Sequence, residues 1–353
     1  MLLQLPTPLR LRPAIHLLPG LLLAGLLAAA ATWSAQWSLP GTLGLSTLTL
    51  AILLGMVVGN LAPAAVLAPS AAGIQLAKQQ LLRLGIVLYG VRLSLTDVAQ
   101  VGWAAVALDA LVLTSTFLVA CLLGMKLLRL PMRDAMLIGA GSAICGAAAV
   151  LATAPVTRSR ADQVAVAVAT VVVFGTLATF LYPWLYGAAL HLEWLAQPRL
   201  FGIFTGATVH EVAQVVAVGQ AVDPAAADAA VVTKMVRVML LAPFLLTLSW
   251  WLGRQHTAVE EGPRRLHIPW FAVGFIAVTG VNTLWPLAEP LRAALVQLDD
   301  ALLAAAMAAL GLGTRIGAVR EAGLRPLLLA ALLFGWLLLV GLAGLYWLPF
   351  GSA

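Results

Sequence analysis

Charged residues are scarce in this chain. Only 10% of its 353 residues are Asp, Glu, Lys or Arg, whereas 62% are hydrophobic and the mean hydropathy is +1.01. Soluble domains carry about 25% charged residues, so this composition excludes an ordinary soluble enzyme. It also excludes a disordered chain, because so much apolar surface does not stay solvated. The sequence therefore predicts an integral membrane protein.

Cysteine and histidine are also few, and the loops are short. The two cysteines, Cys121 and Cys145, both lie within apolar stretches, and the chain has five histidines. Their spacing fits neither a disulfide framework nor a metal site, so we expect no metal and no cofactor. No segment between the apolar runs is long enough for a soluble domain, and no nucleophile–base pair is evident, so we expect no enzyme.

Long apolar runs are abundant. About 20 residues of helix cross the hydrocarbon core of a bilayer, and polar or Pro/Gly breaks separate eleven such runs. The sequence thus predicts an all-α polytopic membrane protein with about eleven transmembrane helices. We place them near 15–35, 41–61, 77–92, 103–124, 134–153, 162–187, 200–219, 229–252, 268–286, 297–314 and 325–348.

The basic residues indicate the orientation. With the N-terminus in the cytoplasm, fourteen of the 20 Lys and Arg residues fall on the inner side and four on the outer side. This bias is typical of membrane proteins, and it places the C-terminus outside. It also explains the net charge of +6 without a nucleic-acid partner. Arg158 and Arg160 are two of the four exceptions, and they either attract anions or pair with Asp162.

A short motif occurs twice. Residues 138–144 and 310–316 share the pattern apolar-Gly-x-Gly-Ser/Thr-x-Ile, five helices apart, so the two copies cross the membrane in opposite directions. Inverted repeats of this kind are a feature of secondary transporters. We therefore predict an N-terminal segment with helix 1 over 1–40, a first repeat over 41–187 (helices 2–6) and a second over 200–353 (helices 7–11).

The glycines of this motif predict interrupted helices. Gly141-Ser142 in helix 5 and Gly313-Thr314 in helix 10 can unwind at mid-membrane and expose main-chain groups to a ligand, so we expect helices 5 and 10 to be discontinuous. Close helix packing is the alternative. A second pairing also stays open, because 141–146, which includes Cys145, resembles 206–211.

Charged and polar residues lie inside helices 7 and 8. Each charge at the bilayer centre costs about 2.5–3.5 kcal/mol on insertion scales, so these groups need partners or water. Glu211 and Arg237 both lie eight residues from the shared outer loop, about 12 Å deep, which predicts a polar ladder between the helices. A buried Glu211–Arg237 ion pair is the structural alternative. The residues of this ladder are Thr208, His210, Glu211, Gln214, Lys234 and Arg237.

The ladder's chemistry suggests an anion site. Arg237 offers a planar fork for an oxyanion, Lys234 a point charge, and Glu211 or His210 a proton carrier. Asp109 in helix 4 is either a further proton site or a partner in an interhelical hydrogen bond. His210-Glu211 also begins an HExxH-like pattern, but Gln214 replaces the second histidine, which disfavours a metalloprotease. The predicted substrate-binding residues are Arg237, Lys234, Gln214, Thr208, Ser142, Thr314, Gly141, Gly313 and Cys145, and the predicted proton-coupling residues are Glu211, His210 and Asp109.

Three segments resemble the YeiH-type sulfate exporter family of bacterial inner-membrane proteins. They are Gly-Ser-Ala-Ile-Cys-Gly at 141–146, Gly-Ala-Thr-Val-His-Glu-Val-Ala-Gln at 206–214 and Thr-Lys-Met-Val-Arg-Val-Met-Leu-Leu-Ala-Pro at 233–243. The resemblance extends from about residue 17 onward. It implies a multi-pass protein of the bacterial plasma membrane, with a distant likeness to sodium/proton antiporters and bile-acid symporters. That group has inverted five-helix repeats and crossed broken helices, which implies that helices 5 and 10 are the crossing pair.

These observations lead to one leading expectation. The chain is expected to be a secondary active transporter that exports a small anion, such as sulfate or a related sulfur oxyanion, driven by a proton or ion gradient. A passive anion channel, or a transporter of an organic sulfonate or carboxylate, is the alternative. The expected partners are the anion and the lipid bilayer, with a homodimer left open.

Overall fold

The computed structural model describes residues 14–36, 46–189, 197–255, 270–315, 317 and 322–348. All regular elements in these ranges are helical, as predicted. Five of the described helices are long and apolar enough to cross a membrane, and shorter apolar helices accompany them. Parts of the predicted N-terminal segment (1–13 and 37–40) and Ile316 of the second motif lie outside the described residues.

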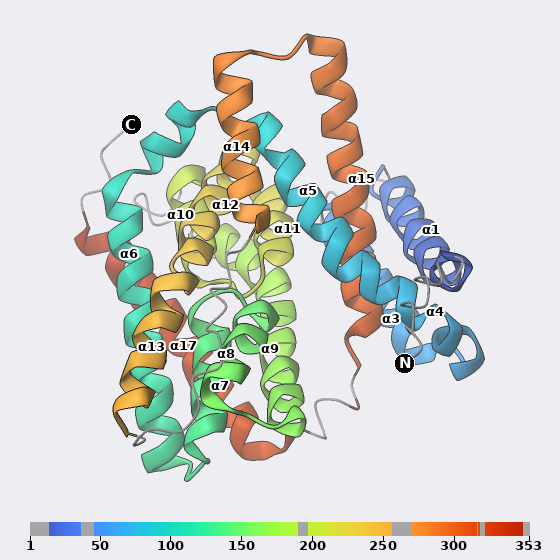
Figure 1. The fold of residues 1–353 in the computed structure, drawn as a ribbon. Coiled ribbons are helices and arrows are strands. Elements are labelled where there is room, and N and C mark those ends of the chain that lie inside the picture. Colours follow the sequence, from blue (N-terminus) through green and yellow to red (C-terminus); the bar gives the residue numbers. More distant parts are fainter. Residues whose placement is uncertain are drawn as a thin grey trace, which may run out of the picture.

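One group of helices, which we call the flanking bundle, extends from α14 at the top centre of Figure 1 to the right of the picture. Helix α15 lies along α3 and α5, α1 packs on α3, α4 and α15, and α14 packs on α5. Its helices are α1 (Leu18–Ser34), α3 (Thr47–Leu61), α4 (Ala64–Leu76), η2 (Ala77–Leu81), α5 (Leu82–Tyr89), α14 (Trp270–Leu284) and α15 (Glu289–Gly313), with the short turns η1 (Ala14–Leu17) and η3 (Gly90–Arg92).

The remaining helices form a second group at the left of Figure 1, which we call the hairpin bundle. Its centre is α10–α12, and most of the alanines and valines of these helices are buried. Its helices are α6 (Leu95–Leu122), η4 (Leu123–Leu127), α7 (Met132–Ala143), α8 (Ala147–Thr157), α9 (Ala161–Ala189), α10 (Pro198–Thr208), α11 (Val212–Val222), α12 (Pro224–Met239), α13 (Leu241–Gln255) and α17 (Leu324–Trp347).

The predicted fifth span is a helical hairpin. Helix α7 ends at Ala143 and α8 begins at Ala147, after a three-residue turn. The two arms lie side by side, because a methyl group placed on Gly141 would be 2.7 Å from Val150 Cγ2. Gln163, just beyond α8, donates a hydrogen bond to Asp134 at the start of α7. Both ends of this hairpin therefore lie at the same end of the bundle.

Gly146 makes the turn of this hairpin. Its φ of 67° and ψ of −134° form a conformation that side-chain-bearing residues rarely adopt. A Cβ at this position would also lie 2.5 Å from Glu211 Cγ. The backbone conformation and the close approach of the Glu211 side chain thus both require glycine at position 146.

The predicted seventh span is a second hairpin. Helix α10 ends at Thr208 and α11 begins at Val212. Gly202 in α10 and Gly219 in α11 both lie against the first turns of α12, at Ala226 and Ala227 respectively. The start of α10 and the end of α11 therefore lie together, beside the start of α12.

The two hairpins enter the bundle from opposite ends. The base of α7–α8 lies beside the start of α9, where Gln163 contacts Asp134. The base of α10–α11 lies beside the end of α9, where the Tyr186 ring is 4.8 Å from the Phe201 ring. Helix α9 has 29 residues, which span about 43 Å. In Figure 1, α7 and α8 accordingly lie below α10 and α11.

The predicted interruption of helix 10 is wrong. Helix α15 is continuous from Glu289 to Gly313. Gly311 instead lies against the backbone of α3 at Ile52, where a methyl group has no room, and Gly55 of α3 lies equally close to α15. These glycines allow close helix packing, which is the alternative that the sequence left open.

The interrupted partner of α7–α8 is α10–α11, as in the second sequence pairing. Adding 65 to the residue numbers of α8 gives the bounds of α11, and the same shift brings the end of α7 onto the end of α10. The bundles in space do not follow the predicted units, because each bundle takes helices from both 41–187 and 200–353.

Candidate functional site

Arg237 contacts both hairpins close to their turns. From α12, its Nε donates to the carbonyl oxygen of Ala143 at 2.7 Å and its Nη2 to that of Ser142 at 3.0 Å. Its Nη1 donates to the carbonyl oxygen of Ala207 near the end of α10. The side chain is fully buried. One guanidinium thus binds the last carbonyls of two helices.

Lys234, one turn earlier on α12, also binds main-chain carbonyls of both hairpins. Its Nζ donates to the carbonyl oxygens of Ile144 at 2.8 Å and Val209 at 2.6 Å. These two residues follow the last residues of α7 and α10, so a single buried ammonium group connects the turns of the two hairpins. The turns therefore meet inside the bundle.

These contacts have a clear electrostatic cause. The last carbonyls of a helix lack main-chain partners and carry partial negative charge, so cations placed there are stabilising. The sequence predicted that Arg237 and Lys234 face a substrate anion. Their observed partners are protein carbonyls, which gives both residues a structural role that the sequence did not indicate; anion binding by either residue stays a prediction.

Glu211 lies at the beginning of two helices. It is the N-cap of α11, and its main-chain N–H donates to Gln214 Oε1 at 3.2 Å in a capping box. Its Oε1 also accepts from the main-chain N–H of Ala147, the first residue of α8, at 3.4 Å. A buried carboxylate therefore faces the positive ends of α8 and α11.

The alternative Glu211–Arg237 ion pair is not formed. Ion pairs in the described part of the chain involve Arg92, Arg160 and Arg292. The sequence argument assumed one straight helix from 200 to 219. Because the chain turns at 209–211, Glu211 faces helix N-termini while the cations face helix C-termini.

Asp109 completes the charge cluster. It lies on α6, is fully buried, and interacts electrostatically with both Arg237 and Lys234. Neither of its carboxylate oxygens has a hydrogen-bond partner among the described residues. Two buried cations and two buried carboxylates thus share the centre of the bundle, and their formal charges balance.

Several other polar atoms around the hairpin turns lack partners within the described ranges. These atoms are Ser142 Oγ, Gln214 Nε2 and both ring nitrogens of His210, and all three side chains are fully buried. The His210 ring stacks on Phe334 of α17. A buried polar group without a partner costs about 1–3 kcal/mol. Buried polar groups without partners are rare in a structural core, so the hairpin turns are the candidate site.

Some predicted site residues are used elsewhere. The Thr208 hydroxyl donates to the Phe204 carbonyl and accepts from the Tyr182 hydroxyl at 2.9 Å. Thr314 lies beyond the end of α15, where its carbonyl accepts from Asn60 of α3. Gly313 is exposed beside Lys78. Thr314 therefore belongs to the α3–α15 contact, and Gly313 lies exposed at the end of α15. Neither lies at the hairpin turns, whereas Gly141 and Cys145 lie in the first hairpin.

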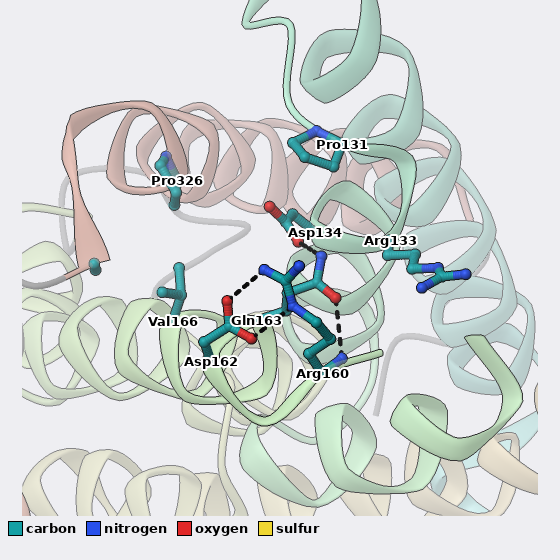
Figure 2. Close-up of a pocket in the computed structure, with 9 residues that line it drawn as sticks. Pro131, Arg133, Asp134, Arg160, Asp162, Gln163, Val166 and Pro326 are labelled. Carbon is teal, nitrogen blue, oxygen red and sulfur yellow. Dashed lines mark hydrogen bonds and ion pairs between the residues drawn. The ribbon is translucent and has the colours of Figure 1, made fainter. Parts of the chain in front are cut away.

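A pocket of about 420 Å³ lies at the base of the first hairpin (Figure 2). It is lined by the start of α7 and the start of α9, and Arg160 pairs there with Asp162 at 2.7 Å. The pairing of Arg160 that the sequence offered as one option is thus confirmed. The hairpin turns lie one arm away, about 17 Å, so this pocket is separate from the charge cluster.

Comparison with known proteins identifies the family. Residues 19–330 match the family described as Conserved hypothetical protein 698. A UPF0324 membrane protein of Pseudomonas aeruginosa is 56% identical over 92% of each chain, and the UPF0324 inner membrane protein YeiH of Escherichia coli is 49% identical over 92% of this chain and 93% of its own. The chain belongs to this family. No solved structure matches it.

This UPF0324 family member is a multi-pass inner membrane protein, since its relatives from Escherichia coli and Salmonella typhi are named inner membrane proteins and it has several helices that can span a bilayer. The YeiH-type resemblance is thereby confirmed. The three segments that carried the resemblance form the two hairpin turns and the stretch of α12 that bears both cations.

Sequence reasoning missed three residues at the site of this family member. Gly146 makes the first turn, Gly175 of α9 gives room to the Gln214 side chain, and Tyr182 holds Thr208. The pairing of 141–146 with 206–211 was a signal for Gly146, because it aligns Gly146 with Glu211. Gly175 and Tyr182 lie in an ordinary apolar helix and carried no such signal.

Proposed function

We propose that this protein is a secondary transporter that moves a small anion across the inner membrane through the charge cluster at the hairpin turns. The observation that carries the proposal is the meeting of two hairpins, entering from opposite ends, at a buried and incompletely hydrogen-bonded polar site. A transporter needs such groups at mid-membrane, whereas a purely structural core does better without them. Transport rather than catalysis is the activity we infer.

The proposal includes a revised topology of nine crossings and two re-entrant hairpins. Each hairpin arm of 11 or 12 residues reaches about 17 Å, roughly half of a bilayer's hydrocarbon core. In this topology Arg158 and Arg160 move to the inner side and Arg199 moves to the outer side. The division of Lys and Arg then changes from fourteen and four to fifteen and three, which strengthens the inside bias.

The two hairpin units also support an internal inverted repeat, with 132–189 equivalent to 197–255. In each unit a hairpin precedes a long helix or helix pair, and the two units enter from opposite ends. An inverted repeat gives the two membrane faces equivalent routes to one central site, which is the basis of alternating access.

The class of substrate follows from the ends of α8 and α11. The free main-chain N–H groups of helix N-termini bind anions, and two such termini converge here. Sulfate and related sulfur oxyanions are the first candidates, because the resemblance suggested them. An organic sulfonate or carboxylate presents the same acceptor oxygens.

Flux in proteoliposomes tests this function. Purified protein is expected to concentrate one of sulfate, sulfite, thiosulfate or methanesulfonate against its gradient when a proton gradient or membrane potential is imposed. The Ser142→Ala variant should lose much of this flux while keeping its fold. Ser70→Ala, a matched change at a buried serine on α4, should keep both its flux and its fold. Flux that never exceeds equilibration would indicate a passive channel, and no flux of any of these anions would contradict the proposal.

A further inference from the structure

The N-termini of α8 and α11 already hold an anion, the carboxylate of Glu211. It caps α11 and accepts from the first N–H of α8 at 3.4 Å, while its Cγ lies 2.5 Å from the position of a Cβ on Gly146. The carboxylate thus fills the space between the two helix ends. A substrate anion that binds these N–H groups must take the same place.

A second observation points to a ligand at this position. The Gln214 Oε1 lies 3.2 Å from the Glu211 N–H, so the whole amide group sits at the N-terminus of α11. Its Nε2 is buried and has no partner among the described residues, although an NH₂ group offers two donors. A donor left free beside a helix N-terminus is suited to an acceptor that arrives from outside the chain.

We propose that Glu211 is a tethered competitor for the substrate anion, and that a proton must neutralise it before the anion binds between α8 and α11. This inference rests on the proposed anion transport and adds its coupling mechanism. Loss of the negative charge removes the attraction that holds the side chain against the two helix ends. The oxyanion then accepts from the vacated main-chain N–H groups and from Gln214 Nε2.

The surroundings leave Glu211 as the group that exchanges this proton. Lys234 from α12 and Cys145 from the first turn interact electrostatically with it. Lys234 is fixed by two carbonyls, and the neighbouring His210 stacks on Phe334. The other charged residues on helices packed against α11 lie away from the turn or pair elsewhere, and α3 has none. Arg199 is at the start of α10 and Asp162 at the far end of α9, Asp228 near the start of α12 accepts from Tyr89, and the charged residues of α15 form the pairs Asp299–Arg92, Asp300–Arg92 and Glu289–Arg292. Asp109 on α6 faces the two cations.

Sulfate binding to the purified protein tests the inference, because sulfate remains a dianion between about pH 5 and about pH 8. The apparent Kd of the wild type should fall by up to about tenfold for each unit that the pH is lowered, and about one proton should be taken up per sulfate bound in weakly buffered solution. Glu211→Gln should bind sulfate equally well across this pH range, with the affinity that the wild type reaches at the low end. Glu211→Asp and the matched control Glu289→Gln, whose side chain is 80% exposed, should keep the pH dependence.

The outcomes separate this inference from the transport function. Sulfate binding by the wild type that is independent of pH and takes up no proton overturns the inference while the anion function stands. The same holds if pH dependence persists in Glu211→Gln, or if that variant folds but binds no sulfate. If neither protein binds or transports sulfate, sulfite, thiosulfate or methanesulfonate at any pH, the anion function itself fails, and the inference with it.

Discussion

At the scale of single residues, the cluster separates charges by helix polarity. Arg237 and Lys234 bind the carbonyl ends of α7 and α10, and Glu211 binds the amide ends of α8 and α11. The sequence predicted these residues inside the membrane region, and the structure buries all three within the hairpin bundle. It could not assign their partners, because the partners are main-chain atoms exposed by turns that no side-chain pattern reveals.

Removal of Lys234 tests the role of this contact. Lys234→Met leaves two buried carbonyls without a donor and one carboxylate without its counter-charge, so we expect the free energy of unfolding to fall by about 3–5 kcal/mol. The measurement is the thermal unfolding midpoint in detergent, compared with Lys126→Met at an exposed position. Equal midpoints for the two variants would show that Lys234 does not hold the hairpins together.

At the scale of elements, hydropathy alone cannot tell a span from a hairpin. Residues 134–153 form an apolar stretch of the length of one crossing, yet they fold as two arms joined at Gly146. Two features of the sequence did point to hairpins, namely the outer placement of Arg158 and Arg160 and the likeness of 141–146 to 206–211. The repeat in 310–316 was misleading, because glycine serves helix packing as readily as helix interruption.

Two neighbouring glycines distinguish these roles in α15. A methyl group on Gly311 would collide with the α3 backbone at Ile52, whereas one on Gly313 would come no nearer than 3.9 Å to Lys78 Nζ. We therefore expect Gly311→Ala to lower the unfolding midpoint clearly and Gly313→Ala to leave it nearly unchanged. A glycine-based interruption of the helix would instead make the two variants similar, and that result would contradict the packing role.

The turn of the first hairpin makes a further prediction. Gly146→Ala places a side chain at a φ of 67° and against Glu211, so it should cost about 1–3 kcal/mol in backbone strain alone and reduce anion flux. Gly335→Ala in α17 is the matched control, because no atom lies within 4 Å of the added methyl group. We expect the control to be as stable as the wild type, and an equally stable Gly146→Ala would rule out the required turn.

At the scale of the whole molecule, the sequence correctly predicted the helical class and the multi-pass inner-membrane location. In the proposed topology, two re-entrant hairpins replace two crossings, so the predicted sides of the N- and C-termini stay the same and only the middle of the chain is reversed. The proposed coupling also determines how the membrane potential acts on the anion. A dianion that carries one proton moves a net negative charge, and an inside-negative potential favours its exit by about 2.3 kcal/mol per 100 mV.

The most direct test of this account is the sidedness of the two hairpin bases. In a background with Cys121 and Cys145 replaced by alanine, single cysteines at the exposed positions Arg158 and Gln197 are labelled in intact cells with a membrane-impermeant maleimide. With re-entrant hairpins, Gln197→Cys is labelled from outside, and Arg158→Cys is labelled only in inside-out vesicles. The reverse pattern, with Arg158→Cys labelled in intact cells and Gln197→Cys protected, would mean that both segments cross the membrane fully and would contradict the central site proposed for this protein.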